Sequence, residues 1–285
     1  MWYGVLALSS IMFGFMFFFK QMYSINYKEE NTIRAMAIFN FIGGIIGIIS
    51  LLIVNGFRFE YTHFSLIMAV ISTINTMLFS FCSLKAFGKI NLSLYSVFSM
   101  LGGMALPFAA GILFYDEPLT LGKGLCFAII TLALFLTVEK REGKSGWIYY
   151  AGVFICNGMA GVISKAFQAA PFEKTSSAGY SILCSVCGLA FGLILVIIYK
   201  PSFKKLNWKV LVGLGGSNAL SRIANWMILV ALSYLPASAQ YPFITGGTMV
   251  VSTVIAYVTH QHPSKKEIAA VALSVVAMVI VALVP

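Results

Sequence analysis

Residues 33–54 read IRAMAIFNFIGGIIGIISLLIV, and Arg34 is the single charged side chain in this stretch. A helix of about 20 predominantly apolar residues is long enough to cross the hydrocarbon core of a bilayer. Lipid offers the backbone no hydrogen-bond partners, and the stretch lacks the alternating pattern of a membrane strand. A helix is therefore the structure that satisfies its polar groups. Residues 33–54 predict a transmembrane helix.

Nine other stretches have the same apolar character and are separated by short connections. Each is long enough for a helix that spans the bilayer. Ser264 and Glu267 have the spacing of a capping box, which predicts that the last helix begins there. The sequence thus predicts ten transmembrane helices, at residues 2–23, 33–54, 64–86, 91–114, 120–138, 147–167, 176–199, 208–233, 237–258 and 265–284.

The composition of the whole chain excludes a soluble globular domain. Hydrophobic residues make up 60% of the 285 residues and charged residues 10%, and the mean hydropathy is +0.92. A soluble domain is roughly 45–50% apolar and roughly 25% charged. We therefore expect an all-α integral membrane protein. The five cysteines lie within the apolar runs, so we expect small buried side chains and no disulfide framework.

The two halves of the chain carry related residues at a constant offset of 145 positions. Such an offset, with polar residues falling on polar residues inside apolar stretches, indicates an internal duplication. Each half, 1–144 and 145–285, would hold five helices. Because five is odd, the second half would be inverted relative to the first, as in secondary transporters with a site near the membrane midplane. The matched pairs include Trp2 with Trp147, Lys20 with Lys165, Thr73 with Asn218, Thr76 with Ser221, Ser80 with Asn225, Gly102 with Gly247, and Pro118 with Pro263.

The basic residues predict how the chain lies in the membrane. Of the 19 Lys and Arg residues, fourteen fall in or beside the connections that follow odd-numbered helices, and four beside those that follow even-numbered helices. Cytoplasmic connections carry an excess of Lys and Arg. We therefore expect a multi-pass protein of the cell's inner membrane with both chain ends outside. The loop positions also explain the net charge of +10 without nucleic-acid binding.

Two short motifs stand at the ends of predicted helices. A Gly followed by a Lys occurs at Gly14 and Lys20 and again at Gly158 and Lys165, and residues 115–122 read YDEPLTLG. Together with the duplicated ten-helix plan, these motifs resemble the EamA-like branch of the drug/metabolite transporter superfamily, which has a Glu-x-Leu-Thr signature. The resemblance implies ten helices in two inverted repeats, and the export of small molecules.

The predicted helix at residues 208–233 carries the densest set of polar residues. Asn218, Ser221, Arg222 and Asn225 are three or four positions apart and share one helix face, with Trp226 beside them. An Arg near the centre of a membrane helix costs at least roughly 2.5–3.5 kcal/mol. No Asp or Glu lies inside a predicted helix beyond its first turn to pair with it. We expect Arg222 to contact a substrate; the alternative is an Arg that extends to the membrane interface or binds backbone carbonyls.

The charge of Arg222 predicts a class of substrate. A guanidinium binds a carboxylate or phosphate through two parallel hydrogen bonds. It therefore favours an anionic or zwitterionic metabolite, such as an amino acid or an organic acid. A bare organic cation would instead require aromatic rings together with a carboxylate inside the membrane.

The predicted helix at residues 64–86, the counterpart of 208–233, carries a second polar stripe. Two such stripes would line a common cavity; the alternative is that their Ser, Thr and Asn side chains hold helices together, at roughly 0.6–2 kcal/mol for each hydrogen bond. The stripe consists of Ser72, Thr73, Asn75, Thr76, Ser80 and Ser83, and the further candidates for substrate binding are Tyr95, Asn157, Gln240 and Tyr241.

Charged residues at helix ends are candidates for gating or ion coupling. Lys20 and Lys165 would meet an anionic substrate at the two gates, or extend to the membrane interface. Glu117 would couple a proton, or stabilise the N-terminus of the following helix; in the second half His262 stands at its position. His260 and His262 lack a third ligand, so we expect a solvated loop and no metal site.

We therefore expect a secondary transporter that moves small polar, anionic or zwitterionic metabolites by alternating access. A multidrug or quaternary-amine transporter remains an alternative, as does a membrane-embedded scaffold or enzyme without transport activity. The expected partners are a small-molecule substrate, the lipid bilayer and a coupling ion such as the proton. The chain would act as a monomer or homodimer, without a catalytic site or cofactor, because nucleotide-binding motifs and nucleophile constellations are absent from the sequence.

Overall fold

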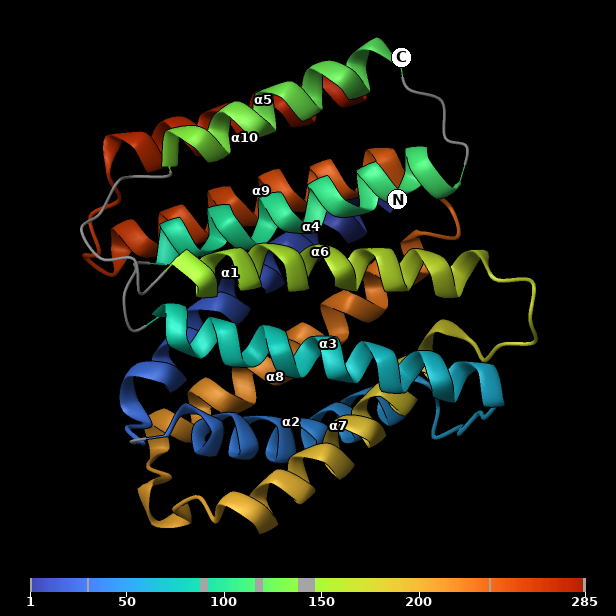
Figure 1. Cartoon of the computed structure of the whole chain (residues 1–285), viewed down its shortest axis with the longest axis vertical. Helices are drawn as coiled ribbons and strands as arrows, with labels where there is room; N and C mark the ends of the chain where they lie inside the picture. Colours follow the sequence, from blue (N-terminus) through green and yellow to red (C-terminus); the bar gives the residue numbers. More distant parts are fainter. Residues whose placement is uncertain are drawn as a thin grey trace.

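The computed structural model describes residues 2–29, 31–87, 92–115, 120–137, 147–235 and 237–283. Figure 1 shows that the helices lie side by side in a bundle. Within the described ranges they are α1 (Trp2–Asn26), α2 (Thr32–Val54), α3 (His63–Phe87), α4 (Leu92–Phe114), α5 (Leu121–Thr137), α6 (Trp147–Ala169), α7 (Ser177–Tyr199), the 3₁₀ helix η1 (Phe203–Lys205), α8 (Trp208–Ala231), α9 (Ala237–Val258) and α10 (Lys265–Leu283).

Each predicted helix is confirmed as a helix, and its ends differ from the structure by three residues or fewer. Among the described residues, α1, α2, α3, α4, α6 and α7 are each long and apolar enough to cross a membrane. The prediction of an all-helical membrane protein is therefore confirmed. The helix ends could be predicted because they depend on local sequence, since an apolar run stops where charged, Pro or capping residues begin.

Capping residues define several helix starts. At the start of α10 the backbone N–H of Glu267 donates to Ser264 Oγ at 3.2 Å, and the backbone N–H of Ser264 donates to the Glu267 carboxylate at 3.4 Å. The predicted capping box is therefore confirmed. The side chain of Asn207 accepts a hydrogen bond from Val210 N at 2.9 Å and caps α8 in the same way. Such caps satisfy backbone donors that a helix leaves unpaired.

Successive helices run in opposite directions along the bundle (Figure 1). The last turns of α1, α3, α5, α7 and α9 lie at one end of the bundle, which we call the basic end because Lys28, Lys85, Lys200, Lys204 and Lys265 are at or beside these turns and the helix starts that follow them. The last turns of α2, α4, α6, α8 and α10 lie at the opposite end, together with Trp2.

Glycines allow some of these helices to pack with their backbones in contact. A Cβ atom added to Gly44 of α2 would lie 2.6 Å from the backbone nitrogen of Leu189 in α7. A Cβ atom added to Gly102 of α4 would collide with the carbonyl oxygen of Phe154 in α6. Small residues favour such close approach between membrane helices, where van der Waals contact drives association.

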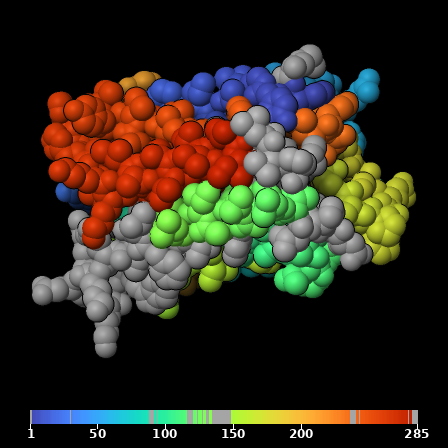
Figure 2. Space-filling model, turned by 90° about the horizontal axis from the view of Figure 1, so that it is seen from above, coloured from blue at the N-terminus to red at the C-terminus, as the bar shows by residue number. Residues whose placement is uncertain are grey.

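The bundle has an inner and two outer parts. α5 and α10 pack on each other at one side, where Figure 2 shows them next to each other on the surface, and α2 and α7 pack on each other at the other side. Between these pairs, α1 packs against α8 and α9, and α6 packs against α3 and α4. The inner helices are the ones that form most of the site described below.

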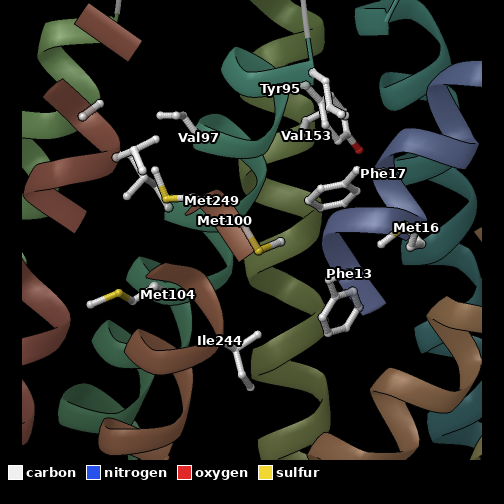
Figure 3. Packing of buried hydrophobic residues seen from close by; sticks show 14 of the residues in the cluster. Phe13, Met16, Phe17, Tyr95, Val97, Met100, Met104, Val153, Ile244 and Met249 are labelled. Atoms are coloured by element: carbon white, nitrogen blue, oxygen red, sulfur yellow. The ribbon is translucent and has the colours of Figure 1, made fainter. Parts of the chain in front are cut away.

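A cluster of buried hydrophobic side chains packs between α1, α4, α6 and α9. Figure 3 shows Phe13, Phe17, Tyr95, Met100 and Met249 within it, and the rings of Phe17 and Tyr95 meet edge to face with centroids 5.1 Å apart. The outer surface is apolar as well: large aliphatic side chains are more than half exposed on the outer faces of α2, α3 and α7, among them Ile53, Ile67 and Ile197. An apolar interior together with an apolar surface is what a bilayer requires of a helical bundle.

Candidate functional site

A cavity of about 200 Å³ lies inside the bundle. Its lining comes from α1, α2, α3, α4, α6, α7, α8 and α9, whereas no described side chain of α5 or α10 contributes. Side chains from both halves of the chain therefore face the same space. The volume suits a small metabolite, since it lies below the roughly 300–1,000 Å³ of pockets that bind drug-sized ligands.

Among the described lining residues, α8 contributes the largest number of polar side chains. Ser217, Asn218, Ser221, Arg222 and Asn225 all line it, because positions three and four apart fall on one face of the helix. Two of these amides bond to their own helix. Asn218 Nδ2 donates to the carbonyl of Leu214 at 3.0 Å, and Asn225 Nδ2 donates to the carbonyl of Ser221 at 2.7 Å.

The side chain of Arg222 extends from α8 towards α2 and α7. Its Nε atom lies 3.2 Å from the place of a Cβ atom on Gly47, and one terminal nitrogen lies 3.6 Å from the corresponding place on Gly188. The glycines leave room for the guanidinium between the two helices. Within the part of the chain that the structure describes, the guanidinium makes no hydrogen bond and no ion pair. Trp226, predicted beside it, is absent from the cavity lining.

Lys20 is a second cation in the lining. Its side chain is only 3% exposed, and its Nζ atom lies 4.4 Å from the ring centroid of Phe79 and 5.4 Å from that of Phe39. An ammonium over aromatic faces gains roughly 0.5–2 kcal/mol, less than burial of the charge costs. Among the described residues, Nζ makes no hydrogen bond and no ion pair, and the thiol of Cys82 is an electrostatic neighbour of Lys20. Lys20 thus faces the cavity and does not extend to the membrane surface.

Lys165, the counterpart of Lys20 in the second half, has different surroundings. Its Nζ atom lies 4.8 Å from the ring centroid of Tyr115, and the residue is absent from the cavity lining. The third predicted gate residue, Glu117, lies outside the described residues. The two lysines occupy equivalent positions in the sequence, but Lys20 lines the cavity and Lys165 does not.

The polar stripe of α3 divides into two groups. Ser72, Thr76 and Ser80 line the cavity. The other three residues bridge helices: Thr73 Oγ1 donates to the carbonyl of Cys184 at 3.3 Å, Asn75 Nδ2 donates to the carbonyl of Cys156 at 2.8 Å, and the hydroxyls of Ser83 and Tyr95 are 2.7 Å apart.

Two of the expected site residues lie outside the cavity lining. Asn75 and Tyr95 are absent from the cavity lining, and both make hydrogen bonds that hold neighbouring helices together. Gln240 is a third case, because it is fully buried and its Nε2 donates to the carbonyl of Ile228 at 2.9 Å, outside the lining.

Asn157 and Tyr241 do line the cavity. Asn157 Nδ2 donates to the carbonyl of Ser99 at 2.7 Å, and the Tyr241 hydroxyl donates to the carbonyl of Gly161 at 3.3 Å. Both side chains therefore form a hydrogen bond to a neighbouring helix and also line the cavity.

Sequence reasoning missed several lining residues. The 145-residue offset could have found Ser217, the counterpart of Ser72, because both line the cavity. Tyr180 and the aromatic rings of Phe39 and Phe79 also line it. No signal in a single sequence marks these rings, since aromatic residues are common throughout the chain and most of them face lipid or the core.

Polar side-chain contacts join neighbouring segments at the basic end of the bundle. At the basic end Gln21 and Gln261 exchange two side-chain hydrogen bonds of 3.0 and 3.2 Å, and Lys205 pairs with Glu29 at 3.5 Å. Burial beside Glu29 raises the pKa of Tyr27 well above its ordinary value.

The described residues contain no group of three or more His, Cys, Asp or Glu side chains that could hold a metal ion. Lys20 and Arg222 are the two basic residues among the described residues that line the cavity.

Comparison with known proteins yields a fold relationship. No protein-family model matches the chain, and no curated protein matches it. Among solved structures, a chain described only as "Crystal structure of protein" aligns over 96% of this chain and 98% of its own length, with a TM-score of 0.63 and 15% sequence identity. At this identity the likeness concerns the fold alone. The chain therefore shares its helical fold, over nearly its whole length, with a protein of known structure.

Proposed function

We propose that the protein is a secondary transporter of small anionic or zwitterionic metabolites, with the central cavity as its substrate site. The observation that carries this proposal is Arg222, a cation inside a membrane protein that lines the central cavity and has no hydrogen bond or ion pair within the described chain. A charge within a membrane-spanning helix that lacks a partner is costly and persists where function requires it. A carboxylate of the substrate would supply the missing partner.

An inverted duplication of five helices is the second part of the proposal. The first four helices of each half begin 145 residues apart: α1 and α6, α2 and α7, α3 and α8, and α4 and α9. Helices of one half also pack against helices of the other half in matching pairs. The contact of α1 with α8 corresponds to the contact of α6 with α3, and the contact of α1 with α9 corresponds to the contact of α6 with α4. Counterpart residues such as Thr76 and Ser221 line the same cavity. These relationships support a site between inverted halves, as in transporters that work by alternating access.

The ten helices would all span the membrane in this proposal. The excess of basic residues at one end of the bundle supports a cytoplasmic basic end and external chain ends. The motifs around Lys20 and at residues 115–122 support membership of the EamA-like branch of the drug/metabolite transporter superfamily. Export is the direction that this resemblance suggests.

Transport of quaternary amines is a second candidate because aromatic rings line the cavity. Phe13, Phe17, Phe39, Phe79 and Tyr241 would offer an organic cation their faces. Two observations disfavour it. Lys20 and Arg222 place two positive charges in the lining, and no Asp or Glu is among the described lining residues. A cationic substrate would be repelled, so we retain the anionic or zwitterionic class.

Flux into proteoliposomes tests the proposal. Vesicles that contain the purified protein would be incubated with a mixture of amino acids, organic acids and quaternary amines, and their contents measured by mass spectrometry. We expect uptake of an anionic or zwitterionic solute above protein-free vesicles. Arg222→Gln should reduce it about tenfold or more, because a charge-assisted bond is lost.

The matched control is Lys85→Gln, which removes one positive charge from the last turn of α3, outside the cavity lining. This variant should retain uptake. Vesicles without solute flux from any of the three classes would contradict transport. Uptake of amines alone, unchanged in Arg222→Gln, would favour the second candidate.

A further inference from the structure

The lining of the cavity contains two cations that contact different positions of α2. Lys20 of α1 and Arg222 of α8 both line it, and within the described chain neither head group has a hydrogen bond or an ion pair. The side chains of Lys20 and Arg222 both contact α2, at different positions along this helix. The Lys20 Nζ atom lies over the ring of Phe39, and Arg222 packs against Gly47. These two positions on α2 are eight residues apart, which is about 12 Å along the helix axis at 1.5 Å per residue.

The side chains of Lys20 and Arg222 thus contact positions of α2 that are roughly two helical turns apart. A solute with an anionic group at each end can contact both, with its middle part between them. The same lining also holds the aromatic ring of Phe79 and the hydroxyls of Thr76 and Ser80, which can contact the middle part of such a molecule. Arg222 would bind one carboxylate through two parallel hydrogen bonds, and the compact ammonium of Lys20 would bind the other.

We propose that the substrate is an elongated dianion, of the class of α,ω-dicarboxylates, held between Lys20 and Arg222. This inference rests on the proposed function, whose substrate class it narrows. A zwitterion would leave its ammonium next to Lys20 or Arg222, without a carboxylate in the described lining to receive it. A monoanion would bring one negative charge to two cations. A dianion with its charges at opposite ends satisfies both cations.

Binding of a chain-length series by the purified full-length protein tests the proposal. The probes are the straight-chain dicarboxylates from malonate to suberate, with valerate as a monocarboxylate, alanine as a zwitterion and glycerol 3-phosphate as a dianion whose charges share one end. Affinity would be measured by calorimetry or by thermal stabilisation in detergent. We expect the affinity of the dicarboxylates to peak at an intermediate length. The best of them should bind about tenfold or more tighter than valerate, because it gains a second charge-assisted contact.

Variants assign the two ends of the probe. Lys20→Gln and Arg222→Gln should each remove the advantage of the dicarboxylate over valerate, whereas Lys85→Gln should keep it. Arg222→Lys retains the charge but loses the paired hydrogen bonds, and it should show an intermediate preference. The chain-length series on the unaltered protein needs no variant, so the proposal stays testable even where a substitution prevents folding.

The outcomes separate this inference from the proposed function. Equal affinity for valerate or alanine and the best dicarboxylate would overturn the dianion, as would a dicarboxylate preference that survives in Lys20→Gln. Tighter binding of glycerol 3-phosphate than of every dicarboxylate would overturn the two-ended arrangement. Proteoliposomes that take up alanine but no dicarboxylate would keep transport and reject the dianion. Binding of a dicarboxylate without flux in vesicles would keep the dianion site and reject transport.

Discussion

The carboxylate of Glu60 accepts two hydrogen bonds from Ser176, one from its backbone N–H at 2.6 Å and one from its hydroxyl at 2.7 Å. Ser176 caps the N-terminus of α7, and Glu60 lies in the connection between α2 and α3. The pair joins two connections that are 116 residues apart, at the end of the bundle opposite the basic end. A charged acceptor at a helix N-terminus is favourable because the backbone donors there lack partners.

These bonds predict a pH dependence of stability. Hydrogen bonds from Ser176 hold the pKa of Glu60 below its ordinary value of 4.5. Because the folded state lowers this pKa, the contribution to stability is fully present above the unfolded-state value and is lost as the pH falls through the folded-state value. We expect Glu60→Gln to lower the Tm at pH 7 by roughly 2 °C, since the group is largely exposed. The difference from the unaltered protein should shrink below pH 4.5, as followed by thermal unfolding in detergent.

The packing of α2 against α7 depends on Gly44. A Cβ atom at this position would lie 2.6 Å from the backbone of Leu189, which cannot move aside as a flexible side chain can. Gly44→Ala should therefore destabilise the protein by roughly 1–3 kcal/mol. The control is Gly215→Ala in α8, where no atom lies within 4 Å of the added carbon. That change should stabilise by about 0.5–1 kcal/mol because Ala favours the helix. Equal effects of the two changes on Tm would contradict the close contact.

Burial of Lys20 predicts an opposition between stability and transport. The side chain is 3% exposed and lacks a hydrogen-bond partner in the described chain, so its charge disfavours the folded state. Lys20→Met keeps the length of the side chain and removes the charge. We expect it to raise stability by roughly 1–3 kcal/mol and to reduce uptake about tenfold or more. A lower Tm in this variant would indicate that Lys20 has a stabilising partner, and retained uptake would exclude it from the site.

The hydroxyl pair of Tyr95 and Ser83 predicts a structural effect without a transport effect. The two oxygens are 2.7 Å apart and both residues are fully buried, outside the cavity lining. Tyr95→Phe leaves the Ser83 hydroxyl its bond to the carbonyl of Phe79 at 2.6 Å. Stability should fall by about 1 kcal/mol. The substrate concentration for half-maximal uptake should stay the same. A marked increase in this concentration would indicate that Tyr95 contributes to substrate binding.

The ten helices could be predicted from the sequence because their physical causes are local. An apolar run of sufficient length favours a helix in lipid wherever it occurs, and residues such as Ser264 and Asn207 cap a helix through neighbours within three positions. The polar face of α8 could be predicted for the same reason. The spacing of Asn218, Ser221, Arg222 and Asn225 places them on one side of a helix, whatever that helix packs against.

Which polar residues reach the cavity was decided by the packing of helices that are distant in sequence. Lys20 and Lys165 stand in equivalent sequence positions, yet only Lys20 is enclosed by Phe39 and Phe79 and faces the cavity. Asn75 is a polar residue of α3 like Thr76, but a carbonyl of α6 lies within its reach, and so it bridges helices. A sequence determines how polar each helix face is. It does not determine which neighbour each face meets, because that depends on the packing of all the helices at once.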